Sequence, residues 1–453
     1  MLIYMVGTPI TFRQGAWQVP DDPIIPYVSG DGSGPDIWRA TQRVMDQAVV
    51  CAYGDSRKIH WQELVAGQRA FNETGEWLPK PTVDMMEQHP ILLKGPLTAP
   101  VGGGIKSLNV ALRYTLDLHT RVRPLQAIPG FPTFIQTPHP IDLTLFREHS
   151  EGLFAGIEAP SGSEKSEKML AFLQAEYPDD YAKVRFASTE EAAKLLEEQG
   201  VREEPRVEVA LDWKPISRLG AERLVRMAIS YALQHGRKSL TLLHKGNAMK
   251  LTEGAFRDWG YALAEREFGE RIYSWATYHR TAAAKGREVA MAEYKAAMQA
   301  GKLEIKDSLV DIFFPQLLAN SQNFDVVVAL NLTGDFVSET LTAMLGAKGL
   351  LPRANVNGTT GRALFEGTQG TSPRLAGTDR VNPVSLILAG QMMLHHLGWE
   401  EPAQLIQLGL ASAMRQSIIT PDLARRFAGH RTVSTTEFAD AICAGMIQTS
   451  ASH

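Results

Sequence analysis

Three arginine residues have the chemistry needed to hold a small acid with several carboxylates. Arg113 ends the segment SLNVALR, Arg123 lies in RVRP, and Arg147 lies in LFRE. A guanidinium group binds a carboxylate through two parallel hydrogen bonds, so three such groups could clamp a multiply charged molecule. Arginines at the ends of strands and helices also pair with structural acids, and the spacing alone leaves both interpretations open.

A group of acidic residues could hold a divalent cation. The segment NLTGDFVSE places Asp335 and Glu339 four positions apart, on one helix face if a helix begins after Gly334. With Asp311 they would offer the oxygen ligands that Mg²⁺ and Mn²⁺ prefer. An acidic pair at this spacing is also typical of a solvated helix face.

Two glycine-rich segments could approach a ligand through their backbone. GDGSG, residues 30–34, is neither GxGxxG nor a P-loop, so it is either a ligand contact or a tight turn. The segment 94–113, KGPLTAPVGGGIKSLNVALR, adds the hydroxyls of Thr98 and Ser107 and the amide of Asn109. This second segment is the richer candidate for binding.

Apolar runs alternate with amphipathic segments, as they do in α/β folds. Strands are expected within 23–36, 89–97, 239–247 and 324–332. Chemistry in such folds gathers at the carboxyl ends of strands, which favours HKGN and NLTGD as site segments. HKGN places Lys245 and Asn247 at a strand end, where Lys245 could act as a base, although a lysine taken alone is more often a surface residue.

Two polar regions interrupt this pattern. Residues 161–206 are rich in charge and are interpreted as an appendage, such as an oligomerisation arm. Residues 281–302 are interpreted as one solvated helix of Ala, Lys and Glu. Neither region offers a catalytic pattern.

Composition excludes several classes of protein. The 453-residue chain is long enough for two or more domains or lobes, and its net charge of −4 argues against a general nucleic-acid or anionic-membrane surface. Two cysteines, Cys51 and Cys443, give no disulfide framework. The N-terminus is a poor signal peptide, and no apolar run approaches the length of a membrane span. A cytoplasmic protein is expected.

The order of several segments is more specific than any one of them. The segments are GDGSGPD, KGPLTAPVGGGIKSLNVALR, LFREHSE, HKGNAMKLTEGAFRDWGY, NLTGDFVSE, FEGTQGTSPRLAG and DRVNP. Together they resemble the β-decarboxylating dehydrogenases, and within that family the bacterial homodimeric NADP-dependent isocitrate dehydrogenases. The resemblance extends from about residue 20 to about residue 445, with gaps in the two polar regions.

The resemblance implies a fold and its division. We expect an isocitrate/isopropylmalate dehydrogenase-like α/β fold, with an open mixed sheet in two lobes and a small clasp arm that holds a second subunit. The large lobe would comprise 1–118 and 346–453, the small lobe 119–151 and 218–345, and the clasp 152–217.

The resemblance also implies the reaction and the site. Isocitrate would be oxidised by NADP and lose a carboxylate with the help of Mg²⁺ or Mn²⁺, a step of the tricarboxylic acid cycle. The substrate residues would be Thr98, Ser107, Asn109, Arg113, Arg123, Arg147 and Asn247. Asp335, Glu339 and the partner's copy of Asp311 would hold the metal, and Lys245 would assist proton transfer across the dimer interface. Glu339 stands where the family has aspartate.

The cofactor residues depart from the family pattern. By resemblance they are Gln316, Glu366, Gln369, Gly370, Thr371, Arg374, Asn382 and Arg425. Gln369 replaces a histidine, and Leu375 and Pro421 replace tyrosines that contact the 2′-phosphate of NADP. Arg374 and Arg425 keep positive charge for that phosphate, which favours NADP and leaves NAD possible.

Phe154 occupies the position of the tyrosine that protonates the enolate in the family, and phenylalanine has no proton to donate. This substitution leaves two alternatives beside isocitrate dehydrogenase. The protein could be a paralogue that oxidises an isocitrate-like acid, such as a phosphonate analogue, or a non-catalytic ligand-binding subunit.

Overall fold

The computed structural model describes residues 7–13, 15–98, 107–424 and 429–450. The chain forms two compact units. The larger contains the residues up to His149 and those from Arg218 onward, and the smaller is Ser150–Ser217. The further division of the larger unit into two lobes stays a prediction.

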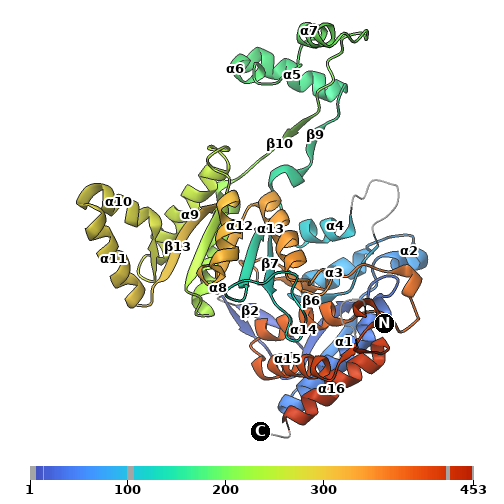
Figure 1. Ribbon diagram of the computed structural model, residues 1–453. Coiled ribbons are helices and arrows are strands. Elements are labelled where there is room, and N and C mark those ends of the chain that lie inside the picture. The colour runs from blue at the N-terminus through green and yellow to red at the C-terminus, as the bar shows by residue number, and fades with distance from the viewer. Residues whose placement is uncertain (1–6, 14, 99–106, 425–428, 451–453) are drawn as a thin grey trace. The chain divides into compact units, whose positions relative to one another are not determined.

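The larger unit is built on one mixed sheet of twelve strands (Figure 1). In chain order they are β1 Thr8–Pro9, β4 Pro23–Val28, β5 His60–Glu63, β6 Ile91–Lys94, β7 Thr120–Gln126, β8 Asp142–Glu148, β11 Ser239–His244, β12 Ile272–Ser274, β13 Leu303–Leu309, β14 Val326–Ala329, β15 Arg353–Val356 and β16 Ala363–Glu366. The path across the sheet is β1-β4-β6-β16-β15-β7-β8-β14-β11-β13-β12, and β5 pairs with β4. Strand β15 is antiparallel to both neighbours and β7 is antiparallel to β8, whereas the other pairs are parallel. The predicted open mixed α/β fold is confirmed.

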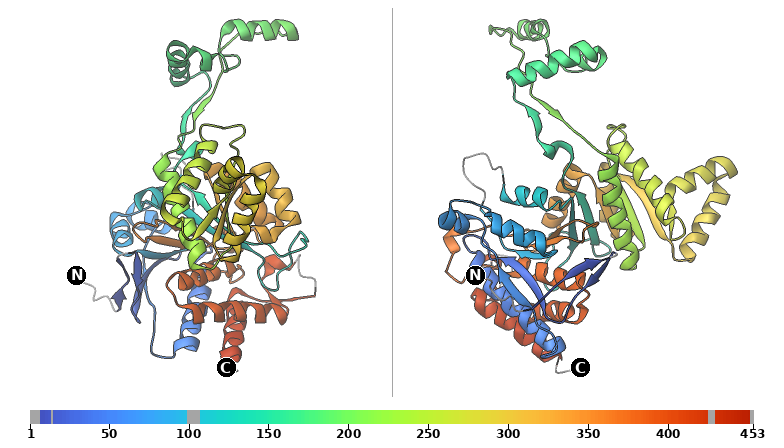
Figure 2. Two further views of the ribbon diagram at one scale, coloured as in Figure 1. Left: turned by 90° about the vertical axis from the view of Figure 1, so that its left-hand side faces the viewer. Right: turned by 180° about the vertical axis from the view of Figure 1, so that it is seen from behind.

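Helices flank this sheet. They are α1 Gly34–Tyr53, α2 Gln68–Thr74, α3 Lys80–Gln88, α4 Leu108–Thr115, α8 Arg218–Gln234, α9 Glu253–Phe268, α10 Trp275–Lys285, α11 Arg287–Gln299, α12 Val310–Ala319, α13 Asn331–Met344, α14 Val384–His396, α15 Glu400–Arg415 and α16 Thr435–Ser450. Helices α1, α14, α15 and α16 pack against one another (Figure 2). Every residue of β6, β11 and β14 is buried, which explains their nearly continuous apolar sequences.

Short elements complete the larger unit. Two small sheets pair β2 Thr11–Arg13 with β3 Ala16–Gln18 and β17 Ile418–Ile419 with β18 Arg431–Thr432. Single 3-10 turns occur at η2 Ser321–Asn323, η3 Pro373–Leu375 and η4 Pro421–Leu423.

The smaller unit has little core of its own. It contains η1 Gly152–Ala155, β9 Ile157–Ala159, α5 Glu164–Glu176, α6 Pro178–Tyr181, α7 Thr189–Gln199 and β10 Leu211–Trp213, with β9 antiparallel to β10. Ser163 and Ser188 cap α5 and α7 by accepting hydrogen bonds from backbone N–H groups. Large apolar side chains such as Phe172, Tyr177 and Trp213 are exposed.

Two expectations about helices were wrong. Residues 281–302 do not form one helix, because α10 ends at Lys285 and α11 begins at Arg287. Gly286 between them has a φ of 93°, a conformation that favours glycine and breaks the helix. Helix α13 begins at Asn331 rather than after Gly334, so this glycine lies in the first turn.

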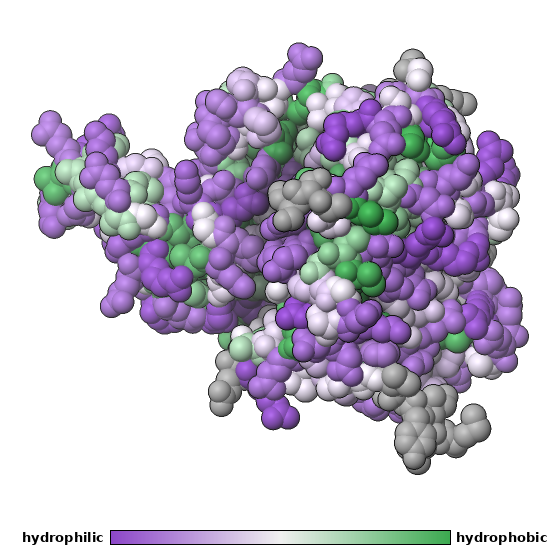
Figure 3. Space-filling model, turned by 90° about the horizontal axis from the view of Figure 1, so that it is seen from below, coloured by the Kyte–Doolittle hydropathy of each residue, from purple (hydrophilic) through white to green (hydrophobic). Residues whose placement is uncertain are grey.

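The surface drawn in Figure 3 is mostly hydrophilic, with apolar side chains gathered in small patches. Within the described ranges, no helix is both long enough and apolar enough to cross a membrane. Both cysteines are free thiols.

The buried side chain of His119, directly before β7, leads us to predict that acid destabilises the fold. Its side chain is 3% exposed, and burial, helped by the charge of Arg223, lowers its pKa to about 4. The unfolded chain therefore takes up a proton at this histidine near its ordinary pKa of about 6.5, before the folded protein does. Stability should be full above that pH and fall as the pH drops towards 4, by up to about 3 kcal/mol from this residue. Urea unfolding at pH 7 and pH 5 measures the loss. His119→Gln should show a smaller pH dependence, and parallel curves for the two proteins would contradict this assignment.

Candidate active site

Charged and polar side chains form a continuous network across the large sheet. Glu366, at the end of β16, accepts hydrogen bonds from Lys94 of β6 at 2.9 Å and from Arg353 and Asn355 of β15 at 2.7 and 2.8 Å. Glu366 and Lys94 are each 2% exposed. Burial opposes ionisation of Glu366, but the charges of Arg353 and Lys94 hold its pKa well below the usual value. The ionised carboxylate therefore joins three strands.

Arg121 extends this network onto β7 and β8. Its Nε donates to Asn355 Oδ1 at 3.3 Å, and the residue lies directly opposite both Asn355 and Arg147 in the strand register. Directly opposed residues point to the same face of a sheet. We refer to Lys94, Glu366, Arg353, Asn355, Arg121 and Arg147 as the charged row.

Arg147 connects the charged row to helix α13. Its Nε and Nη2 donate to Asn331 Oδ1 at 3.0 and 2.8 Å, and its Nη1 pairs with Asp335. A Cβ atom at Gly334 would lie 2.8 Å from Arg147 Cγ, closer than side chains normally approach. The glycine in the first turn of α13 thus permits the contact between helix and arginine.

Arg123 makes the second connection to α13. It is 2% exposed, and its Nη1 donates to Glu339 Oε1 at 2.6 Å and to the Ser338 hydroxyl. Burial acts to raise the pKa of Glu339, but Arg123 outweighs it and the pKa is lowered. Asp335 and Glu339, one helical turn apart, therefore each face one arginine of the predicted clamp.

Two of the three predicted metal ligands come together. The carboxylates of Asp335 and Glu339 lie on one face of α13 and suit a hard divalent cation. In the part of the chain that the structure describes, no three His, Cys, Asp or Glu side chains are grouped as a metal site. Asp311, on α12, instead pairs with Lys245 at 2.7 Å.

The loop that carries Lys245 is held by a partly buried network. His244 Nδ1 accepts from the Gly246 N–H at 2.9 Å, so its Nε2 donates to Asp307 at 3.0 Å. The Tyr261 hydroxyl donates to the same Asp307 carboxylate at 2.6 Å. Lys245 is partly exposed beside this network and Asn247 is exposed.

Arg113 comes from the short helix α4. Ser107 is the N-cap residue, although its hydroxyl makes no cap hydrogen bond, and Asn109 and Arg113 are one turn apart. Arg113 donates to the Asn109 carbonyl at 2.9 Å and to His149 Nδ1 at 3.0 Å. Burial lowers the pKa of Arg113 to about 10. Among the described residues the buried Asn109 Oδ1 has no hydrogen-bond partner.

A recess of about 250 Å³ opens beside the charged row. Its lining includes Lys94, Thr98, Asn109, Arg353, Glu366, Gln369, Gly370 and Thr371. Within the described ranges, both amide atoms of Gln369 are buried without a partner. Unsatisfied buried amides are rare in folded proteins, so Asn109 and Gln369 favour a polar ligand here.

The loop 30–34 packs closely against backbone that lines this recess. A Cβ atom at Gly30 would lie 2.4 Å from the Pro96 carbonyl oxygen, and one at Gly32 would lie 2.3 Å from the Thr371 carbonyl oxygen. The Ser33 N–H and hydroxyl both donate to that Thr371 oxygen. The glycines serve close backbone packing, which agrees with the tight-turn interpretation.

The remaining predicted cofactor residues are dispersed. Arg374 and Leu375 lie in the exposed turn η3, and Gln316 lies on α12, following Pro315. Asn382 caps α14 by accepting from the Val384 N–H and donates to Asp422. Pro421 begins η4, and Arg425 lies outside the described residues.

Phe154 belongs to the smaller unit. It lies in the turn η1 and is 50% exposed.

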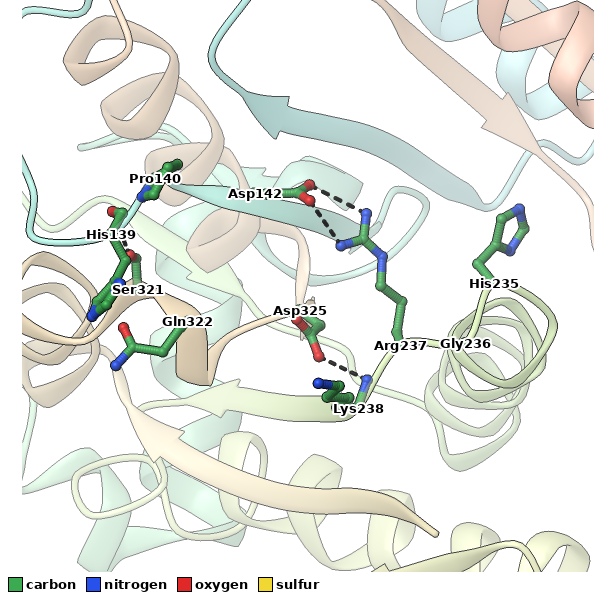
Figure 4. A pocket seen from close by; sticks show the side chains of 10 residues that line it. All are labelled: His139, Pro140, Asp142, His235, Gly236, Arg237, Lys238, Ser321, Gln322 and Asp325. Atoms are coloured by element: carbon green, nitrogen blue, oxygen red, sulfur yellow. Dashed lines mark hydrogen bonds and ion pairs between the residues drawn. The ribbon is translucent and has the colours of Figure 1, made fainter. Parts of the chain in front are cut away.

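A second polar pocket lies at the amino ends of β8, β11 and β14 (Figure 4). Arg237 donates twice to Asp142 at 3.2 Å, and the backbone of Lys238 donates to Asp325 at 2.7 Å. Asp142 begins β8, and Lys238 and Asp325 immediately precede β11 and β14. These are the amino ends of β8, β11 and β14, whereas Arg147, Lys245 and Asn331 lie at or just after the carboxyl ends of the same strands. Arg237 pairs with Asp142 and Asp325 accepts from backbone N–H groups, so we assign no chemistry to this pocket.

Comparison with known proteins agrees with this arrangement. The family model described as isocitrate/isopropylmalate dehydrogenase matches residues 24–442. The chain belongs to this family. It is 44% identical over 436 residues to a protein of Staphylococcus epidermidis named isocitrate dehydrogenase [NADP], covering 96% of this chain and 98% of that protein. It is 41% identical to the protein of that name from Coxiella burnetii, with coverages of 96% and 94%.

Among solved structures, the chain resembles isocitrate dehydrogenase from Methylococcus capsulatus. The TM-score is 0.67 at 29% identity, and the match covers 94% of this chain and 99% of that one. The family predicted from the sequence motifs is therefore confirmed.

Sequence reasoning missed part of the site. Arg121, Arg353, Lys94 and His149 were not singled out, although the alternation in TRVRP places Arg121 and Arg123 on the same face of one strand. Arg353 and Lys94 could not be found in this way, because their role depends on strands from distant parts of the chain.

The contact between Gly334 and Arg147 yields a testable prediction. In Gly334→Ala, the new methyl group would displace the Arg147 stem, since its nearest neighbours are the Cγ and Cβ atoms of that residue. We expect KM for isocitrate to rise about tenfold or more, as after loss of a charged hydrogen bond. Gly390→Ala, whose methyl group would meet the side chain of Met45, is the control. Equal KM values for the two variants would contradict this role of Gly334.

Proposed function

We propose that this family member catalyses oxidative decarboxylation of isocitrate to 2-oxoglutarate with NADP as oxidant. The single observation that carries the proposal is the approach of Arg123 and Arg147 to the two carboxylates of α13. Such an arrangement can hold a carboxylated substrate and a divalent cation side by side. The names of the relatives point to the same reaction.

Each residue has a proposed task in this reaction. Arg113, Arg123 and Arg147 bind the substrate carboxylates, helped by Thr98, Ser107 and Asn109. Asp335 and Glu339 hold Mg²⁺ or Mn²⁺, which polarises the hydroxyl oxygen and stabilises negative charge there when bound. Because Asp335 and Glu339 contact Arg147 and Arg123, the residues that would hold the metal and those that would bind the substrate lie side by side.

Lys245 and Asp311 are proposed to act across a homodimer. They pair with each other in one chain, and among the described residues Asp311 does not form a metal-binding group with Asp335 and Glu339. A second subunit could supply them, with Asn247, so that each site is shared. The exposed apolar side chains of the smaller unit also favour burial against another copy. We further propose a cytoplasmic enzyme, as two free thiols suggest.

Replacement of Phe154 by tyrosine, which adds a hydroxyl at this position, tests the role of Phe154. Wild-type protein with Mn²⁺ should form NADPH from isocitrate. If Phe154 replaces the proton donor, Phe154→Tyr should raise kcat by about tenfold or more, because a positioned acid contributes roughly 10²–10⁴-fold. Phe172→Tyr, in the same unit, is the control. No NADPH from wild type would overturn the proposed function. An unchanged kcat in Phe154→Tyr would show that protonation proceeds without that position.

Cofactor preference tests Arg374. This exposed arginine is proposed to bind the 2′-phosphate of NADP, so Arg374→Asp should lower kcat/KM for NADP by about tenfold or more and affect NAD little. Arg380→Asp, an exposed arginine six residues away, is the control. A similar loss with both cofactors would contradict the assignment.

A further inference from the structure

The active site contains more positive charge than the three-arginine clamp requires. Arg121 and Arg353 belong to the charged row and have no part in the reaction proposed above. Arg353 forms an ion pair with Glu366, to which its Nε donates at 2.7 Å. Arg121 differs, because among the described residues its one hydrogen-bond partner is the neutral Asn355 Oδ1 at 3.3 Å.

Arg121 lies beside the clamp. It is directly opposite Arg147 and two residues before Arg123 on the same face of β7. Burial is the largest cause that lowers the pKa of Arg121. The nearby guanidiniums of Arg353, Arg147 and Arg113 lower it further. Arg121 still keeps some accessible surface, so its unused donors can reach a ligand.

Arg113 is the second guanidinium that no carboxylate contacts in the described part of the chain. Its partners are the Asn109 carbonyl and the neutral ring of His149. Burial and the nearby charges of Arg121 and Arg113 lower the pKa of His149 well below its usual value, so this ring accepts from Arg113 and adds no charge. The charge of Glu366 acts on both Arg113 and Arg121, but this carboxylate is already paired with Lys94 and Arg353. Among the described residues, Arg113 and Arg121 therefore add to an excess of positive charge.

One carboxylate neutralises one of these charges. A tetrahedral dianion carries two charges and three acceptor oxygens, which can serve two guanidiniums at once. Burying unpaired cations is costly, and the strands fix their positions rather than letting them separate.

We propose that Arg121 and Arg113 form a dianion-binding position in this site, and that the enzyme accepts isocitrate-like 2-hydroxy acids in which one carboxylate is replaced by a phosphonate. This inference rests on the proposed function, since it assigns the substrate class of the same site. Where the phosphonate replaces a carboxylate other than the β-carboxylate, NADP oxidises the hydroxyl carbon to a ketone and the β-carboxylate leaves as CO₂, as with isocitrate.

Isocitrate and a set of analogues, each with a different carboxylate replaced by phosphonate, test the proposal. At least one analogue should form NADPH with a kcat/KM equal to or above that of isocitrate. Arg121→Gln should lower kcat/KM for that analogue roughly 10- to 100-fold more than for isocitrate, since charged hydrogen bonds are lost. Arg121→Lys keeps the positive charge but loses the two parallel donors of the guanidinium. Its kcat/KM for the phosphonate analogue should lie between those of wild type and Arg121→Gln. Arg237→Gln removes only the ion pair with Asp142 in the pocket at the amino ends of β8, β11 and β14, so its kcat/KM values should match those of wild type.

The possible failures are distinguishable. Turnover of isocitrate with rejection of every analogue would overturn the dianion position and leave the proposed function intact. The same conclusion follows if Arg121→Gln lowers both activities equally. Turnover of neither substrate class by wild type would overturn the proposed function. If Arg121→Gln does not fold, the wild-type panel and Arg121→Lys still decide the question.

Discussion

The ionised carboxylate of Glu366 is the interaction on which the site depends. It is buried at the end of β16 and forms ion pairs with Lys94 and Arg353, from strands on either side. Without it, three or more positive charges would face one another in a region of low dielectric, where their repulsion is strong. Removal of a buried partner typically costs several kcal/mol, because the remaining charges are uncompensated. Glu366 was predicted as a cofactor contact, and it lines the recess, but both of its oxygens already accept hydrogen bonds.

The sheet supplies the precision that the chemistry needs. The amino end of β15 meets the carboxyl ends of β16 and β6, and the amino end of β7 meets the carboxyl end of β8. The register places Arg121 directly opposite both Asn355 and Arg147. Arginines from β7, β8 and β15 therefore share a face, and α13 brings Asp335 and Glu339 onto two of them. Side chains on strands are held more rigidly than side chains on loops, which limits the reorganisation required when substrate and metal bind.

Positive charge in excess of the protein's own counterions is the signature of a polyanion site. Arg147 and Arg123 have partners in α13 that a metal ion would engage, whereas Arg113 and Arg121 contact only neutral acceptors in the described part of the chain. The first pair suits ligands that arrive with a cation. The second pair suits an anion that brings its own charge, which links the reaction class to the choice of substrate.

The sequence by itself determined the family and the α/β class, because long motifs survive as linear patterns. From the same motifs it predicted Arg113, Arg123, Arg147, Asp335 and Glu339 as site residues. It also indicated the pairing of Asp335 and Glu339, since one helical turn fixes their spacing. It could not reveal the charged row, in which Lys94, Arg121, Arg353 and Glu366 come from four strands whose order differs from their order in the chain. Nor could it show that Gly286 splits a helix or that Gly334 admits Arg147, because these depend on backbone geometry and close approach. The sequence determines the spacing of residues within one helix or strand, but strand register and the balance of charges exist only once the sheet has formed.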